Sequence, residues 1–220
     1  MSKLVWDAIG ERTYETGTKE GALYVVGDDG AYGAGVAWDG LISVSETPSG
    51  AESTSLYAND GKYLDLTSAE EFGGTITAYQ SPEEFDACDG NKEIAPGVLI
   101  SQQDRKSFGF AFKTTLGNDT NGNNYGYVLH LIYGAKASVS ERSYTSINES
   151  PEAMELSWDF TTTPVQVAGS KPTSIIRINS VKANAEKLAA LEKILYGDES
   201  AEPRLPLPEE VATLMSTTNG

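Results

Sequence analysis

Residues 62–90 read KYLDLTSAEEFGGTITAYQSPEEFDACDG and place a strand pattern directly before a short helix pattern. From Phe72 to Tyr79 apolar and polar residues alternate, with Phe72, Ile76 and Ala78 on one face. A period of two is typical of a strand that buries one face and exposes the other. We therefore expect a half-buried strand over 72–79.

The residues after this strand predict a short helix. Ser81 is a suitable N-cap, and Pro82 fits the first helical position, where its missing N–H costs nothing. Glu84, three residues after the cap, completes a capping box. Phe85 and Cys88 are three positions apart and supply an apolar stripe. One small helix, starting at Pro82, is expected to pack on a sheet.

Short strand patterns separated by turn residues fill much of the remaining chain. We expect strands over 22–26, near Val36, and over 41–45, 55–58, 62–67, 98–101, 106–115, 125–133, 139–147, 156–160 and 175–181. In strand 106–115 three phenylalanines share one face, and strand 125–133 is apolar on both faces, which predicts a central, covered strand. About ten short strands with one internal helix predict a mainly β fold, an all-β sandwich or barrel.

The last forty residues change character. From Asn184, a good N-cap, an apolar stripe at helical spacing runs through Leu188, Leu191 and Leu195, and Gly197 ends it. The prolines that follow predict an extended segment, and 208–215 could add a final helical turn or two. We therefore divide the chain into an N-terminal arm (1–20), a β-sandwich (21–181) and a C-terminal helix with an extended arm (182–220).

Composition limits the classes of function. The chain has 220 residues, enough for one domain with a sizeable core. Its formal net charge of −16 argues against a protein that grips nucleic acid or an anionic membrane, because phosphate binding depends on Lys and Arg. A single cysteine, Cys88, excludes an intrachain disulfide. No apolar run is long enough for a membrane span and the N-terminus lacks a signal-peptide pattern, so we expect folding in the cytoplasm.

The nearest approach to a metal site lies in the polar segment 116–126, where Asp119, Asn121 and Asn123 imitate the first half of a calcium loop. The pattern departs at the positions that matter, because Asn124 stands for the glycine and His130 for the bidentate glutamate. The segment is better explained as a flexible loop, and we expect no metal and no cofactor.

No catalytic constellation emerges. Glu70 and Glu71 could be proposed as a glycosidase pair, but adjacent carboxylates in a strand point to opposite faces. Glu83 and Glu84 are explained by the positive end of a helix. His130 lies within the most apolar strand, which favours a structural role. The chain is therefore not expected to be an enzyme.

Four segments together carry a family resemblance: KLVWDAIGERTYETG (3–17), SAEEFGGTITAYQSPEEFDACDG (68–90), YGYVLHLIYGAKA (125–137) and SPEAMELSWDFTTTPVQV (150–167). In this order they resemble the major tail proteins, or tail-tube proteins, of long-tailed bacteriophages that infect mostly Gram-positive bacteria. The resemblance implies a β-sandwich whose sheets join those of neighbouring copies, with rings, most often hexamers, stacked into a hollow tube. It places the protein in the virion tail, assembled in the host cytoplasm.

The resemblance also implies partners. These are further copies of the chain, a tape-measure protein, and tail terminator and distal tail proteins, while genomic DNA passes through the lumen during ejection without specific binding. We expect the 116–126 loop and the terminal arms to bridge rings. The residues expected at contacts between copies are Trp6, Asn118, Asp119, Asn121, Asn123, Leu188, Leu191, Leu195, Leu205, Leu207, Val211 and Leu214.

An alternative is a carbohydrate-binding β-sandwich module. Such a module needs surface aromatic side chains beside polar groups, and Trp38, Tyr32 and Tyr57 are the candidates. A glycosidase that uses Glu70 or Glu71 is the least favoured hypothesis.

Overall fold

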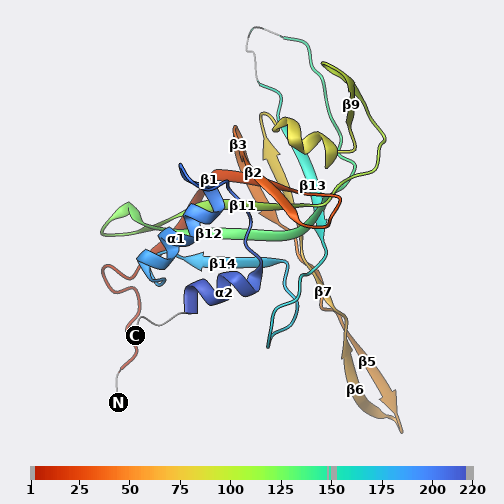
Figure 1. The fold of residues 1–220 in the computed structure, drawn as a ribbon. Coiled ribbons are helices and arrows are strands. Elements are labelled where there is room, and N and C mark those ends of the chain that lie inside the picture. Colours follow the sequence, from red (N-terminus) through yellow and green to blue (C-terminus); the bar gives the residue numbers. More distant parts are fainter. Residues whose placement is uncertain (1–2, 148, 150–152, 217–220) are drawn as a thin grey trace.

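The computed structural model describes residues 3–147, 149 and 153–216 (Figure 1). The chain is mainly β, as predicted. In order, its elements are β1 (Thr13–Val26), β2 (Tyr32–Trp38), β3 (Leu41–Glu46), β4 (Ser49–Gly50), β5 (Ser53–Ala58), β6 (Gly61–Thr67), β7 (Glu70–Glu71), β8 (Gly73–Ala78), η1 (Glu83–Ala87), β9 (Lys92–Ala95), β10 (Val98–Ile100), β11 (Phe108–Asn118), β12 (Gly122–Ala137), β13 (Leu156–Thr162), β14 (Ile175–Asn179), α1 (Ala185–Tyr196) and α2 (Pro208–Ser216).

The body is built on one antiparallel sheet in the order β2-β1-β11-β12-β13-β8-β3, with β14 as a further partner of β12. β12 serves both halves of this sheet. Its Val128–Ile132 stretch pairs with β14, and its Ala135–Ala137 stretch pairs with β13. Gly134 lies between the two stretches with φ +60°, a conformation that favours glycine. The strand therefore changes partners at Gly134, and the two halves of the sheet pack face to face.

The first core lies between the halves of the sheet and is aromatic at its centre. The Trp38 ring packs edge-on against Trp158 at 5.5 Å, and Phe85 of η1 lies 4.7 Å from Trp38. The three phenylalanines of β11 are buried here, as the sequence predicts. The short helix after β8 also packs on this core, but it is a 3-10 helix whose N-cap is Pro82, without the side-chain cap predicted from Ser81.

The second core lies between the opposite face of β1, β11, β12 and β14 and the two α-helices, which cover that face (Figure 1). The Asn184 side chain caps α1 by accepting hydrogen bonds from the backbone N–H groups of Glu186 and Lys187, as expected of an N-cap. Tyr24 donates to the Leu195 carbonyl at 2.7 Å and Tyr133 to the Pro206 carbonyl at 3.0 Å. The C-terminal helices are therefore part of the body, and the strand predicted to be covered on both faces, now β12, is covered on both.

Two strand predictions and one loop prediction differ from the structure. β1 begins at Thr13, nine residues before the predicted strand, so residues 13–20 of the expected arm belong to the sheet. The predicted 139–147 strand is wrong, because these residues form no strand. The predicted long loop at 116–126 is wrong as well, because β11 and β12 pair up to Asn118 and Gly122 and leave only 119–121 as a turn.

Residues 49–71 form a projecting arm. β4 and β7 pair at its base, and β5 and β6 pair beyond them, so that the arm extends away from the body (Figure 1). The sequence predicts two strands here, 55–58 and 62–67, but not that both leave the body.

Candidate assembly interface

The projecting arm ends in a tight hairpin. Ala58 pairs with Gly61, and the two turn residues, Asn59 and Asp60, have φ of 49° and 58°. Two consecutive residues with positive φ are typical of the type I′ turn, whose twist matches that of paired strands. Within the arm Ser55 donates to Asp65 at 2.6 Å, and Lys62 pairs with the same carboxylate at 2.7 Å. The arm is therefore an ordered hairpin.

One face of the arm carries a leucine seam that we define as Leu56, Leu64 and Leu66. Leu56 lies directly opposite Leu64, and Leu66 follows two positions along the same strand, so the three side chains share a face. All three are exposed, between 39% and 55%. The other face carries Tyr57 and Tyr63, which are more than 70% exposed. Monomers rarely expose apolar residues so closely grouped, and an isolated two-stranded hairpin is marginally stable in water.

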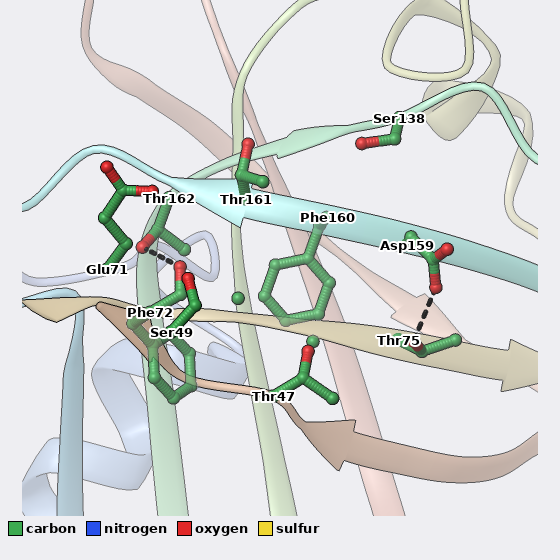
Figure 2. Close-up of a pocket in the computed structure, with 12 residues that line it drawn as sticks. Thr47, Ser49, Glu71, Phe72, Thr75, Ser138, Asp159, Phe160, Thr161 and Thr162 are labelled. Carbon is green, nitrogen blue, oxygen red and sulfur yellow. Dashed lines mark hydrogen bonds between the residues drawn. The ribbon is translucent and has the colours of Figure 1, made fainter. Parts of the chain in front are cut away.

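The base of the arm contains a pocket of about 370 Å³. Hydroxyl groups line much of it, and Figure 2 shows Glu71 and Asp159 at opposite ends. Thr75 donates to Asp159 at 2.5 Å, and Thr162 donates to the Phe72 carbonyl at 2.7 Å. The first bond joins β8 to β13, and the second joins β13 to Phe72, the residue that directly follows the arm. Of the two glutamates weighed as a glycosidase pair, only Glu71 lines this pocket, and both are exposed.

The N-terminal segment is a second exposed apolar element. Leu4, Val5, Trp6 and Ile9 are 72–86% exposed. The segment is tied to the body near its end, where the Gly10 N–H donates to Asp119 Oδ1 at 2.9 Å and Asn118 Nδ2 donates to the Gly10 carbonyl at 3.0 Å. Arg12 Nε also donates to the Asp7 carbonyl at 2.9 Å.

The polar turn at 119–121 and the residues beside it therefore form hydrogen bonds within their own chain. Asn118 is buried, and its side-chain oxygen accepts from the backbone N–H groups of Thr120 and Asn121, while Asn123 accepts from the Tyr14 hydroxyl at 2.8 Å. Of the three side chains that suggested a calcium loop, Asp119 and Asn123 thus accept hydrogen bonds from their own chain. Among the described residues, no cluster of three or more His, Cys, Asp or Glu could hold a metal ion.

Most of the C-terminal residues expected at contacts between copies are covered by their own chain. Five of them are buried in the second core: Leu188, Leu191, Leu195, Leu205 and Val211. This is a correction with a simple cause, because the apolar stripe of α1 packs on the sheet of the same chain. Of the remaining apolar candidates, Leu207 is exposed and Leu214 is half-buried, so these two and Trp6 stay available for contact.

The aromatic residues considered for carbohydrate binding do not form a common surface. Trp38 is buried in the first core, and its indole N–H donates to the Gln80 carbonyl at 2.8 Å. Tyr32 is half-buried, with its hydroxyl accepting from the Gly134 N–H at 2.9 Å. Only Tyr57 is fully available, on the projecting arm. The carbohydrate platform inferred from these three residues is wrong.

The large sheet ends in two edge strands, β2 and β3. The Gly35 N–H of β2 donates to the Pro203 carbonyl at 2.8 Å, so the C-terminal segment covers part of that edge. Among the described residues β3 pairs only with β8. Unpaired strand edges can bond to another chain, and β3 offers such an edge.

A buried lysine, Lys113, joins α1 to the sheet. Lys113 binds Glu20 at 2.7 Å and Glu192 of α1 at 2.9 Å, and its ammonium lies 4.7 Å from the centre of the Tyr127 ring. Burial lowers the pKa of Lys113, but the hydrogen bonds to Glu192 and Glu20 outweigh it, so the pKa lies above its ordinary value. Lys113 therefore stays charged and joins α1 to the sheet.

His130 of β12 lies on the face of the sheet opposite to Lys113, and its ring stacks on the Phe112 ring with 4.4 Å between the ring centres. Its Nε2 lies 3.0 Å from the Thr114 hydroxyl and 3.4 Å from Glu15, and its Nδ1 lies 3.7 Å from Glu46, which is paired with Arg177. Burial lowers the pKa of His130 below its ordinary value, although the two glutamates oppose the shift. The imidazole is a packed structural group, as the sequence suggests.

No helix of the described residues is long and apolar enough to cross a membrane.

No protein-family model and no curated protein matches the chain. Among solved structures, it is similar to a chain from the cryo-EM structure of an extracellular contractile injection system, the PVC sheath-tube complex in its extended state. The match covers 80% of this chain and 94% of that chain, with 14% identity and a TM-score of 0.38. A TM-score this low supports no conclusion about function, so a functional proposal has to rest on this chain's own residues.

Proposed function

We propose that the chain is a structural protein that assembles with copies of itself into stacked rings, forming a tail tube of the kind that the sequence resemblance implies. One observation carries this proposal: an ordered arm that leaves the body and exposes the leucine seam to solvent. Burying these side chains against a second copy removes apolar area from water, which contributes roughly 25 cal/mol per Å².

Other features support an assembly role. β3 leaves an unpaired strand edge, and pairing that edge with a neighbouring copy closes the sheet around a ring without leaving a template for aggregation. The net charge of −16 suits a channel surface that repels nucleic acid phosphates. Six copies in a ring, passage of DNA, contact with tape-measure and terminator proteins, and location in a virion tail belong to the same proposal.

Sedimentation velocity on the purified chain, over a wide concentration series, tests self-association. The proposal predicts a sedimentation coefficient that rises with concentration towards a defined oligomer. A single monomeric species at every concentration would contradict it.

A further inference from the structure

An apolar groove of about 460 Å³ lies between β14 and α2, on the helix-covered side of the body. Its apolar lining includes Ile176 and Ile178 of β14, Ala183, and Val211, Ala212 and Met215 of α2. Among the described residues that line it, the charged ones are Arg177 and Lys182, both positive. Arg177 is paired with Glu46, whereas Lys182 has no ion pair within the described part of the chain. The groove therefore suits a short apolar segment that carries a negative charge.

The N-terminal segment 4–9, LVWDAI, has this chemistry. Five of its six residues are apolar, and the sixth is Asp7. The large side chains are exposed, so they do not pack on their own body. The segment lies at the end of the sheet that holds the β11–β12 turn, and it extends away from the body (Figure 1). An exposed apolar segment and an apolar groove on one chain complement each other.

We propose that residues 4–9 of one copy fill the β14–α2 groove of the next copy, with Trp6 buried against Ala212 and Met215 and Asp7 beside Lys182. This inference rests on the proposed function, because the partner is a second copy of the chain. The contact is heterologous, since segment and groove are different surfaces, and such contacts propagate from copy to copy. The Gly10 hydrogen bonds to Asn118 and Asp119 fix the point from which each segment leaves its own body.

Disulfide trapping between two single variants tests this contact. Trp6→Cys and Ala212→Cys are purified separately, mixed under assembling conditions and oxidised with copper phenanthroline. Cys88 is fully buried, so it gives little background. Glu209→Cys, exposed on the same helix but outside the groove, replaces Ala212→Cys in the matched control. We expect disulfide-linked dimers at least tenfold more abundant in the Trp6–Ala212 mixture than in the control.

Iodide quenching of tryptophan fluorescence tests the same contact without a new cysteine. Trp38 and Trp158 are buried, so Trp6 is the accessible tryptophan of the monomer. Assembly is expected to remove most of the quenchable fraction in the unmodified chain and to change little in Trp6→Phe. Trp6 that stays fully quenchable in assembled protein would overturn the inference.

The outcomes separate this inference from the proposed function. Oligomers in sedimentation without cross-linking above the control would overturn the groove contact and leave self-association standing. Cross-linking only within the double variant Trp6→Cys/Ala212→Cys, as a faster-migrating monomer, would overturn it too, because the segment would then fill its own groove. A chain that stays monomeric throughout would contradict both.

Discussion

Leu56 of β5 lies directly opposite Leu64 of β6, and both side chains are exposed on an arm that leaves the body. A cross-strand leucine pair is ordinarily found over a core, where neighbouring side chains cover it. Here the two residues remain 42% and 39% exposed. The pair, extended by Leu66, is therefore the surface on which the proposed assembly depends most.

The double substitution Leu56→Thr/Leu66→Thr tests the leucine seam. Threonine keeps the strand preference and removes most of the apolar area. We expect self-association to weaken at least tenfold, because burying a leucine side chain is worth roughly 1.5–3 kcal/mol. The melting temperature of the body should stay unchanged, since the seam is outside both cores. The control is Tyr144→Thr, which removes an exposed aromatic side chain outside the arm. This variant should associate normally.

Gly134→Ala is expected to destabilise the fold strongly. A Cβ at Gly134 would overlap the Thr163 carbonyl oxygen, and φ is +60°. The control Gly169→Ala has a similar φ of +73° but open space around the added carbon. Gly169→Ala therefore measures the free-energy cost of the strained backbone conformation alone, about 1–3 kcal/mol. Urea unfolding should give a larger loss for Gly134→Ala, and equal losses would mean that the close approach of β12 to Thr163 is unimportant.

Lys113→Met is expected to lower the free energy of unfolding by up to about 3–5 kcal/mol, because removing one partner of a buried ion pair leaves its carboxylates poorly compensated. Glu192 lies on α1, so the helix should lose its attachment to the sheet first. In the control Lys106→Met the lost pair, with Asp28, is exposed, and stability should barely change. Chemical unfolding followed by circular dichroism measures both. Similar stability for the two variants would show that the Lys113 cluster contributes little.

His130 predicts a pH dependence of stability. Because burial holds its pKa in the folded chain below the ordinary value of 6.5, the unfolded chain binds more protons between these two values. Stability should therefore be highest above pH 6.5 and fall as pH decreases towards the lowered pKa, where this contribution is fully lost. Protonation also places a charge beside Arg177, while Glu15 and Glu46 moderate the cost.

The variant His130→Gln should lose this component of the pH dependence. Thermal unfolding of both proteins from neutral to mildly acidic pH measures it, before most carboxylates titrate. An identical decline in the two proteins would assign the effect to other groups.

The sequence predicts correctly those strands in which apolar and polar residues alternate or the apolar residues are continuous. β11, β13 and the apolar centre of β12 bury the side chains expected from the pattern, and α1 begins and ends at its predicted caps. The first half of β1 escapes detection, because residues 13–20 are polar and mostly exposed and owe their strand conformation to pairing with β11. The predicted 139–147 strand fails for the opposite reason: its Val139, Tyr144 and Ile147 are exposed and no strand pairs with it.

The residues proposed for assembly are harder to predict than the fold. An apolar stripe such as Leu188, Leu191 and Leu195 indicates that this face of the helix is covered, but not by which surface. Here the sheet of the same chain covers it. The leucine seam shows the reverse case. Its alternation resembles that of any half-buried strand, and only the three-dimensional course of the arm leaves it uncovered.

Negative-stain electron microscopy of the unmodified chain beside Leu56→Thr/Leu66→Thr, at matched concentrations, tests the central claim most directly. The account predicts rings or hollow tubes for the unmodified chain, and few or none for the variant. Isolated particles of monomer size for both proteins at every concentration would contradict it.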